Sequence, residues 1–326
     1  MNKRFDVVAL GELLIDFTGN GISEQGNPLF EANPGGAPCN VLSMLQRLGK
    51  KTAFVGKVGN DSFGEMLIGA VKEQGINTDY LTKDDDIPTT LAFVHTKADG
   101  DRSFSFYRKP GADMMLRTSD FDKELLADTR VFHFGTLSMT DSAIAEVTKC
   151  AVNMAKQAGA IISFDPNYRP LLWNDVEAAK AAMWYGISEC DILKIADDEI
   201  EFLTGETDID KGVSVIAEKT SAKIICATLG KNGSKVFYRG NTYKCELFCE
   251  PFIRENTIET TGAGDTFMAC VLNFVLENGI DSMSDESLKK MLNFANAAAS
   301  IITTRKGALR VMPTVDEVTE LLKSRS

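Results

Sequence analysis

The run Phe5-Asp6-Val7-Val8-Ala9-Leu10 is the first of a series of short apolar segments that decide the fold. Each segment is rich in Val, Ile and Phe and shows little alternation with polar residues. This pattern is typical of strands buried on both faces of a parallel sheet. The other predicted strands are residues 52–58, 131–134, 160–164, 191–195, 223–228 and 234–238.

Helical patterns lie between these segments. Apolar residues recur at helical spacing within 41–48, 267–275 and 315–322, and Gly49 supplies a C-terminal stop for the first of them. Because strand and helix patterns alternate over most of the 326 residues, we expect one doubly wound α/β domain.

One region departs from this alternation. Residues 90–96 and 102–108 are rich in β-forming residues and are joined by turn-forming residues 97–101. Phe104 and Phe106 alternate with polar neighbours, so the predicted hairpin has one apolar face. We expect a small lid that stands off the main sheet; a surface hairpin without function is the alternative.

The composition argues against several classes of partner. The chain has 35 basic and 46 acidic residues, a net charge of −11, so it gains little from binding nucleic acid. It lacks a stretch of the ~20 mostly apolar residues that cross a bilayer. Asp6, Glu12 and Asp16 interrupt any signal-peptide core, so we expect a cytoplasmic protein without a membrane partner.

The segment Glu259-Thr260-Thr261-Gly262-Ala263-Gly264-Asp265-Thr266-Phe267 carries the strongest chemical signal. Small residues at a helix N-terminus let backbone amides approach an anion, which the helix dipole also favours. Asp265 either takes a proton there or caps the helix. Phe267 occupies the third glycine position of G-x-G-x-x-G, so the dinucleotide motif is excluded.

A second segment, Pro34-Gly35-Gly36-Ala37-Pro38-Cys39-Asn40, also leads into a predicted helix. Paired glycines let a polar ligand approach the backbone, and the Asn40 amide can both donate and accept hydrogen bonds. An ordinary tight turn is the alternative. Asp16 follows the first predicted strand, and ligands of doubly wound folds bind beyond the carboxyl ends of strands.

Together these two segments resemble the signature motifs of the ribokinase-like (PfkB) carbohydrate kinases, and the resemblance extends over about residues 5–313. Within the family the chain is most similar to fructokinases. The similarity is carried by Gly11-Glu12-Leu13-Leu14-Ile15-Asp16-Phe17, Pro34-Gly35-Gly36-Ala37-Pro38, Phe106-Tyr107-Arg108-Lys109-Pro110-Gly111-Ala112-Asp113, Asp165-Pro166-Asn167-Tyr168-Arg169-Pro170-Leu171-Leu172-Trp173 and residues 194–205.

The resemblance implies one ribokinase-like domain over 1–326, with a discontinuous β lid at about 14–31 and 89–112. It implies a kinase that transfers phosphate from ATP, with Mg²⁺, to the 6-hydroxyl of D-fructose. A kinase of 2-keto-3-deoxygluconate, ribose or a nucleoside is the alternative. A sugar sensor without catalysis is a further one, although the intact Gly262-Ala263-Gly264-Asp265 argues against it.

The resemblance also assigns roles to single residues. Asp265 would be the base, and the amides of Gly262, Ala263 and Gly264 would form an anion hole for the transferred phosphoryl group. The sugar-binding residues would be Asp16, Gly35, Gly36, Asn40, Phe106, Arg108, Arg169 and Asp265. Arg108 and Arg169 would either bind hydroxyls or clamp the carboxylate of an acid substrate.

The remaining implied roles concern ATP and cations. The nucleotide would be bound by Lys194, Thr228, Gly230, Gly233 and Asn296, and Glu199 would hold Mg²⁺ through water. Ala196 stands where the family has Asn. A potassium ion would lie among mainly backbone carbonyls of Glu259, Thr261, Arg305 and Gly307, although the family usually has Asp at position 259. A homodimer through the lid is a further implication.

Overall fold

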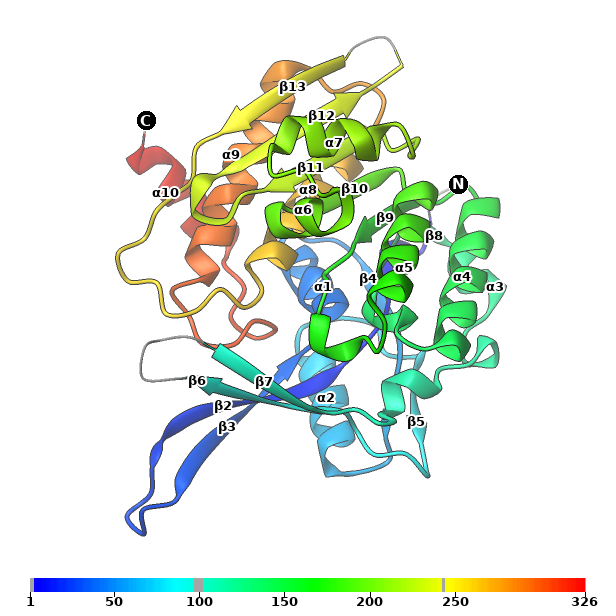
Figure 1. The fold of residues 1–326 in the computed structure, drawn as a ribbon, viewed down its shortest axis with the longest axis vertical. Helices are drawn as coiled ribbons and strands as arrows, with labels where there is room; N and C mark the ends of the chain where they lie inside the picture. Colours follow the sequence, from blue (N-terminus) through cyan, green and yellow to red (C-terminus); the bar gives the residue numbers. More distant parts are fainter. Residues whose placement is uncertain (1–2, 97–101, 242–243, 326) are drawn as a thin grey trace.

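A nine-stranded sheet forms the centre of the computed structural model, which describes residues 3–96, 102–241 and 244–325 (Figure 1). The strand order is β13-β12-β11-β10-β9-β8-β1-β4-β5, parallel from β11 to β5, with β12 and β13 antiparallel. The strands are β1 (Phe5–Leu10), β4 (Thr52–Gly59), β5 (Leu81–Asp84), β8 (Thr129–Gly135), β9 (Ile161–Asp165), β10 (Ile192–Ala196), β11 (Ile224–Thr228), β12 (Ser234–Arg239) and β13 (Lys244–Cys249).

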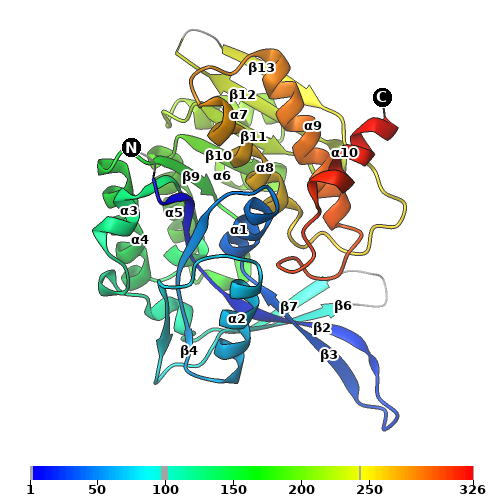
Figure 2. The same cartoon turned by 180° about the vertical axis from the view of Figure 1, so that it is seen from behind.

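Helices cover both faces of this sheet, because its central strands are apolar on both sides. One apolar core contains α1 (Ala37–Arg47), α2 (Ser62–Glu73), α8 (Ala263–Asn278), α9 (Asp285–Ile302) and α10 (Val315–Ser324), which lie in front in Figure 2. The opposite core contains α3 (Lys123–Ala127), α4 (Ser142–Gln157), α5 (Val176–Glu189), α6 (Asp197–Thr204) and α7 (Ile209–Ala217).

A four-stranded sheet stands off the main body (Figure 1). Its order is β3-β2-β6-β7, and its strands are β2 (Leu14–Ile22), β3 (Pro28–Gly35), β6 (Leu91–Thr96) and β7 (Arg102–Tyr107). Phe17 of β2 stacks on Phe93 of β6, with ring centroids 4.8 Å apart, and meets Phe63 of α2 edge-on. This aromatic contact joins the small sheet to the main domain.

The structure confirms the doubly wound α/β fold, and the predicted buried strands deviate from the observed ones by one or two residues at their ends. The sequence did not predict β5 and β13. The predicted turn at 97–101 lies outside the described residues. No helix among the described residues has both the length and the apolar character needed to cross a membrane.

Candidate active site

A cavity of about 470 Å³ lies between the small sheet and the carboxyl ends of the parallel strands. Its wall is made by β2 and β3, by the N-termini of α1 and α8, and by residues that follow β8 and β9. Ligands of doubly wound folds bind at this edge. The polar residues that line it are Glu12, Asp16, Thr18, Asn33, Asn40, Asn167, Arg169, Lys194, Glu259, Thr260, Thr261 and Asp265.

Asp265 lies in the first turn of α8, behind the N-cap residue Gly262. Gly262 has a φ of +78°, and a Cβ there would come within 2.7 Å of the Ala308 side chain, so the turn requires glycine. The Asp265 carboxylate is 8% exposed, and Asn40 Nδ2 donates to its Oδ2 at 2.8 Å. Burial raises the pKa of Asp265 to about 6 despite the Asn40 hydrogen bond, which lowers it. The group is therefore suited to accept a proton near neutral pH.

The start of α1 is as tightly constrained. Gly36 is its N-cap residue, with a φ of +143°, and a Cβ there would lie 2.4 Å from the Glu12 carbonyl oxygen. A Cβ on Gly35 would lie 2.3 Å from Asp16 Oδ2. The Ala37 amide donates to Glu12 Oε1 at 2.8 Å, so a buried carboxylate takes the place of a side-chain cap. Burial raises the pKa of Glu12 to about 7.

Asp16 and Arg169 both line the cavity. Burial raises the pKa of Asp16 to about 7; the Arg169 guanidinium opposes this rise and the Glu259 carboxylate adds to it. Arg169 is exposed, and its Nη1 donates to the Tyr168 carbonyl at 3.1 Å. This part of the cavity therefore combines a readily protonated carboxyl group, that of Asp16, with the exposed Arg169 cation.

A buried ion pair lies at the inner end of the cavity. Lys194 Nζ is 3.0 and 2.9 Å from the two carboxylate oxygens of Asp165. Burial opposes the charge on Lys194, but Asp165, Glu199 and Asp265 together raise the pKa of its ammonium group. Glu199 accepts the amides of Tyr168 and Ala196, each at 2.8 Å. Asp165 was missed as a site residue, although it directly follows the predicted strand 160–164.

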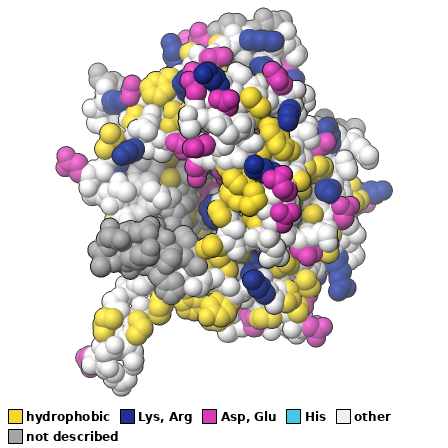
Figure 3. Space-filling view, viewed as in Figure 1, with side chains coloured by type: hydrophobic (Ala, Val, Ile, Leu, Met, Phe, Trp, Pro, Cys, Tyr) yellow, Lys and Arg dark blue, Asp and Glu magenta, His cyan; other side chains and the backbone are white. Residues whose placement is uncertain are grey.

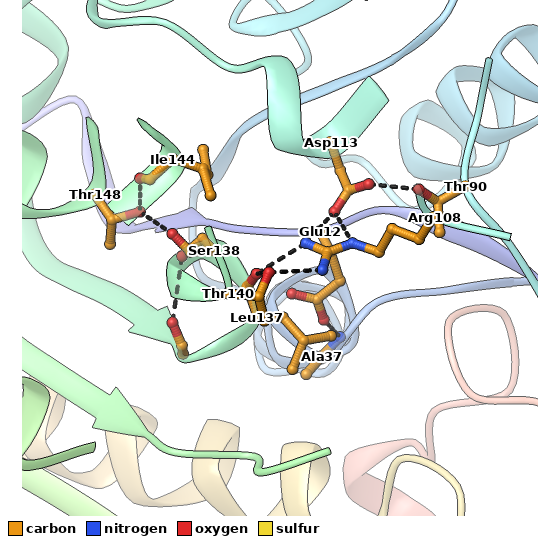
Figure 4. A network of polar contacts seen from close by, with 11 residues as sticks. Glu12, Ala37, Thr90, Arg108, Asp113, Leu137, Ser138, Thr140, Ile144 and Thr148 are labelled. Carbon is orange, nitrogen blue, oxygen red and sulfur yellow. Dashed lines mark hydrogen bonds and ion pairs between the residues drawn. The ribbon is translucent and has the colours of Figure 1, made fainter. Parts of the chain in front are cut away.

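Phe106, which we expected to bind the sugar, lines this cavity. Arg108, which we also expected there, does not line it. Its guanidinium is buried and bound to Asp113, to the Leu137 carbonyl and to Thr140 (Figure 4). It lines a neighbouring cavity of about 420 Å³ instead. The hypothesis that Arg108 contacts the sugar therefore finds no support in the geometry.

The residues expected to bind nucleotide continue along the carboxyl ends of the strands. Thr228 ends β11, and Gly230 and Gly233 frame the turn into β12. Gly233 has a φ of +96°, and a Cβ there would lie 2.3 Å from the Cys249 carbonyl oxygen. The Asn296 side chain is bound within the protein, accepting from Ser234 and donating to the Cys249 and Glu250 carbonyls.

The two segments expected to hold a monovalent cation lie side by side. Glu259 Oε1 accepts the Gly307 amide at 2.7 Å, and the Thr303 carbonyl accepts the amides of Ile258 and Glu259. The Arg305 side chain points elsewhere, to the Val311 carbonyl and to Glu317. Thr261 lines the cavity between them.

The residues present fit a bound polyphosphate. A Cβ on Gly264 would lie 3.1 Å from Lys194 Nζ, so the backbone of α8 and this ammonium group face a common space. The backbone amides at the N-terminus of α8 and the Lys194 ammonium group can therefore donate hydrogen bonds to the same anion. The Ala263 amide donates to the Thr260 carbonyl at 3.2 Å and closes the turn. Across the described ranges, no group of three or more His, Cys, Asp or Glu side chains is arranged to hold a metal ion.

Comparisons with known proteins agree with this geometry. The family model described as pfkB family carbohydrate kinase matches residues 4–315. The chain is 39% identical over 319 residues to probable fructokinase-2 of Arabidopsis thaliana, covering 97% of this chain and 95% of that protein. Its fold is similar to the fructokinase with bound ATP from Xylella fastidiosa, with a TM-score of 0.87, 32% identity and 99% of both chains covered.

A second solved structure is also similar. It is a double mutant of the fructokinase from Vibrio cholerae O395, described in its fructose, ADP and potassium ion bound form. The TM-score is 0.85 at 26% identity, and the match covers 99% of both chains.

The constraint at Gly36 predicts the effect of a single methyl group. We expect Gly36→Ala to lower the free energy of unfolding by about 2 kcal/mol or more, because it combines a strained φ with a clash against the Glu12 carbonyl. Gly159→Ala is the matched control: its φ is +77° but nothing lies within 4 Å, so it is expected to cost about 1 kcal/mol. Urea unfolding of both variants measures the difference; equal losses would contradict the clash.

Proposed function

The chain belongs to the pfkB family of carbohydrate kinases, and we propose that it is a fructokinase that transfers the γ-phosphoryl group of ATP to the 6-hydroxyl of D-fructose. The observation that carries the proposal is the buried Asp265 at the N-terminus of α8, which is hydrogen-bonded to Asn40 in the wall of a polar cavity. A carboxylate beside an anion cradle repels phosphate unless it serves to take a proton.

In the proposed reaction, Asp265 accepts the proton of the sugar 6-hydroxyl while the 6-hydroxyl oxygen attacks the γ-phosphorus of ATP. The new O–P bond forms as the bond to the bridging oxygen breaks, and ADP leaves with the released charge. The amides of Gly262 and Gly264 at the start of α8 stabilise the transferred group, whereas the Ala263 amide already donates to the Thr260 carbonyl. Such positioning is the main demand of phosphoryl transfer. Mg²⁺, when bound, neutralises the charge of the phosphates.

The Lys194 ammonium group lies close to this amide cradle, since a Cβ on Gly264 would lie 3.1 Å from its Nζ. Its pairing with Asp165 holds the ammonium group in place and keeps it charged. The proposed nucleotide path runs from there past Thr228, Gly230 and Gly233, toward Asn296. Glu199 supports this path through its bonds to two backbone amides and would contact Mg²⁺ through water.

The charges around the cavity favour a neutral sugar over a sugar acid. Carboxylates of Glu12, Asp16, Glu259 and Asp265 line it. The neighbouring cations already have carboxylate partners. Arg108 pairs with Asp113, and Lys194 pairs with Asp165. The Arg169 guanidinium interacts electrostatically with the Asp16 carboxylate and lowers its pKa. Sugar hydroxyls can donate to these carboxylates, whereas a substrate carboxylate would be repelled. Asp16, Asn40, the Gly35-Gly36 backbone, Phe106 and Arg169 are the proposed sugar-binding groups.

We further propose a potassium ion among the carbonyls near Glu259, Thr261, Arg305 and Gly307. The contact between Glu259 and the Gly307 amide supports this, because it brings the two segments together. The fructokinase structure from Vibrio cholerae, in a potassium-bound form, supports it by likeness.

The proposed lid consists of the small sheet, at about 14–31 and 89–112. It carries exposed apolar side chains, among them Ile22, Leu29, Phe30 and Tyr107. Hydrophobic atoms lie along the projecting arm at the lower left of Figure 3. An exposed strand edge with apolar residues can pair with another copy, so we propose that a homodimer forms through this sheet.

The raised pKa values predict a steep acid limb. Asp265 and Asp16, with pKa values of about 6 and 7, must both be ionised in the free enzyme. We therefore expect log(kcat/KM) for fructose to fall below pH ~7 and to approach a slope of two below pH ~6. Asp16→Asn, with its weakened binding, is expected to retain a slope of one. A slope of one in the wild type would contradict the double requirement.

If Asp265 is the base, its replacement should lower kcat and leave the binding of fructose and ATP nearly unchanged. Asp265→Asn keeps the shape of the side chain but cannot accept the proton, so kcat is expected to fall by more than about 100-fold. Binding of fructose and ATP, measured by calorimetry, is expected to remain within about fivefold of wild type. A variant that keeps more than about a tenth of the wild-type kcat would contradict the assignment.

The function itself is tested by ADP release with ATP, Mg²⁺ and K⁺ against fructose, 2-keto-3-deoxygluconate, ribose, glucose and adenosine. We expect kcat/KM for fructose to exceed the others by at least about tenfold. A preference for the keto-acid would instead identify an acid kinase of the same family. Binding of fructose and ATP without ADP release would identify a sensor.

A further inference from the structure

Arg108 lies at the end of the small sheet, directly after β7, and its guanidinium is almost completely engaged inside the protein. Nε donates to Asp113 Oδ2 at 2.8 Å, and Nη2 lies 2.7 Å from the same oxygen. Nη2 also donates to the Leu137 carbonyl and Nη1 to Thr140 Oγ1, each at 2.8 Å. The side chains of Arg108 and Asp113 are 3% and 1% exposed. Figure 4 shows this arrangement.

Asp113 is fixed from its other side as well. Thr90 Oγ1 donates to Asp113 Oδ1, so both carboxylate oxygens are bound. Gly111 leaves room for this contact, because a Cβ there would lie 1.8 Å from Thr90 Oγ1 and 2.9 Å from Asp113 Oδ1. The carboxylate is therefore built into the fold as the permanent partner of Arg108.

The pair lies beside the proposed sugar cavity, not in it. Phe106 lines both this cavity and the neighbouring one that Arg108 borders. Leu137, whose carbonyl accepts from Arg108, also lines the sugar cavity. Glu12 is the next carboxylate, but its Oε1 accepts the Ala37 amide. Asp113 thus occupies the guanidinium face on which the carboxylate of a substrate would bind.

We propose that Asp113 determines specificity: by pairing with Arg108 inside the protein, it withholds this guanidinium from the carboxylate of a sugar acid and reserves the cavity for neutral sugars. The inference rests on the proposed function, because it names the substrate class that a fructokinase rejects. Asp113 acts through Arg108 and touches no substrate itself. Specificity of this kind comes from withholding a partner from the competitor as much as from binding the correct substrate.

The test is the substrate ratio of Asp113→Asn. This change keeps the size of the side chain and removes the charge, which leaves a buried guanidinium in need of an anion. We expect kcat/KM for 2-keto-3-deoxygluconate, relative to fructose, to rise by about tenfold or more. The matched control is Asp120→Asn, which removes the carboxylate of the Lys57–Asp120 ion pair outside the cavity. Its ratio is expected to stay within about twofold of wild type.

A double variant separates the charge effect from loosened packing. Arg108→Gln with Asp113→Asn replaces the ion pair by two neutral amides, so the gain on the keto-acid is expected to disappear. If the gain persists in the double variant, it does not come from Arg108 and the proposal is overturned. An unchanged ratio in folded Asp113→Asn also overturns it.

A second variant tests the proposal if Asp113→Asn does not fold. Thr90→Val keeps the volume of the side chain and removes the hydroxyl that donates to Asp113. The Asp113 carboxylate is then held less firmly against Arg108. We expect a change of the ratio in the same direction, by about threefold. No change in this variant, in the absence of a folded Asp113→Asn protein, overturns the proposal.

Measuring the binding of a sugar acid in the absence of ATP tests the role of Asp113 separately from the proposed kinase activity. Calorimetry with D-gluconate and no ATP is expected to show tighter binding to Asp113→Asn than to wild type by about tenfold. If wild type phosphorylates no sugar but this shift is observed, the proposed function fails and the role of Asp113 stands. Equal gluconate binding by the two proteins, beside normal fructokinase activity in the wild type, overturns the role of Asp113 alone.

Discussion

The hydrogen bond between Asn40 and Asp265 is the contact on which the candidate site depends. It joins the first turns of α1 and α8 across 225 residues of chain. The two helices can begin here because Gly36 and Gly262 leave room: a Cβ would meet the Glu12 carbonyl at 2.4 Å in one case and Ala308 at 2.7 Å in the other. The same packing buries Asp265 and raises its pKa to about 6. The two glycines thereby allow the close helix packing in which the proposed base is buried.

Burial also explains the other charges of the cavity. It is the largest cause of the raised pKa values of Glu12, Asp16 and Asp265, and the nearby cations offset it only in part. Lys194 cannot offset more because Asp165 binds it on both carboxylate oxygens. The result is a cavity in which Glu12, Asp16 and Asp265 exchange protons near neutrality, while Lys194 is paired with Asp165. Such a surface matches hydroxyl groups, each of which donates and accepts a hydrogen bond.

The sequence predicted the parts of this structure that follow uniform rules. The parallel strands that are apolar on both faces were found within two residues. The mostly polar edge strand β5 was missed, as was β13, which alternates between exposed and partly buried residues. The glycine segments predicted Asp265, Gly36 and Asn40 as site residues because glycine before a helix has a specific use, and the structure brings these three residues to one cavity. The environment of Arg108 could not be predicted from the motif at 106–113 alone. The motif contains both Arg108 and Asp113, but only the structure shows that the two side chains pair inside the protein.

The two buried ion pairs beside the cavity illustrate why one cation can serve a ligand and the other cannot. Lys194 is a compact ammonium group with three donors on a flexible stem, so it can keep Asp165 and still turn a donor toward phosphate near Gly264. Arg108 is a planar fork whose donors meet Asp113, Leu137 and Thr140 together, so it cannot rotate toward a ligand without losing several bonds at once. A buried ion pair adds little stability over a well-packed apolar pair. The Arg108–Asp113 pair is therefore better explained by the orientation and the selectivity that it imposes than by the stability of the fold.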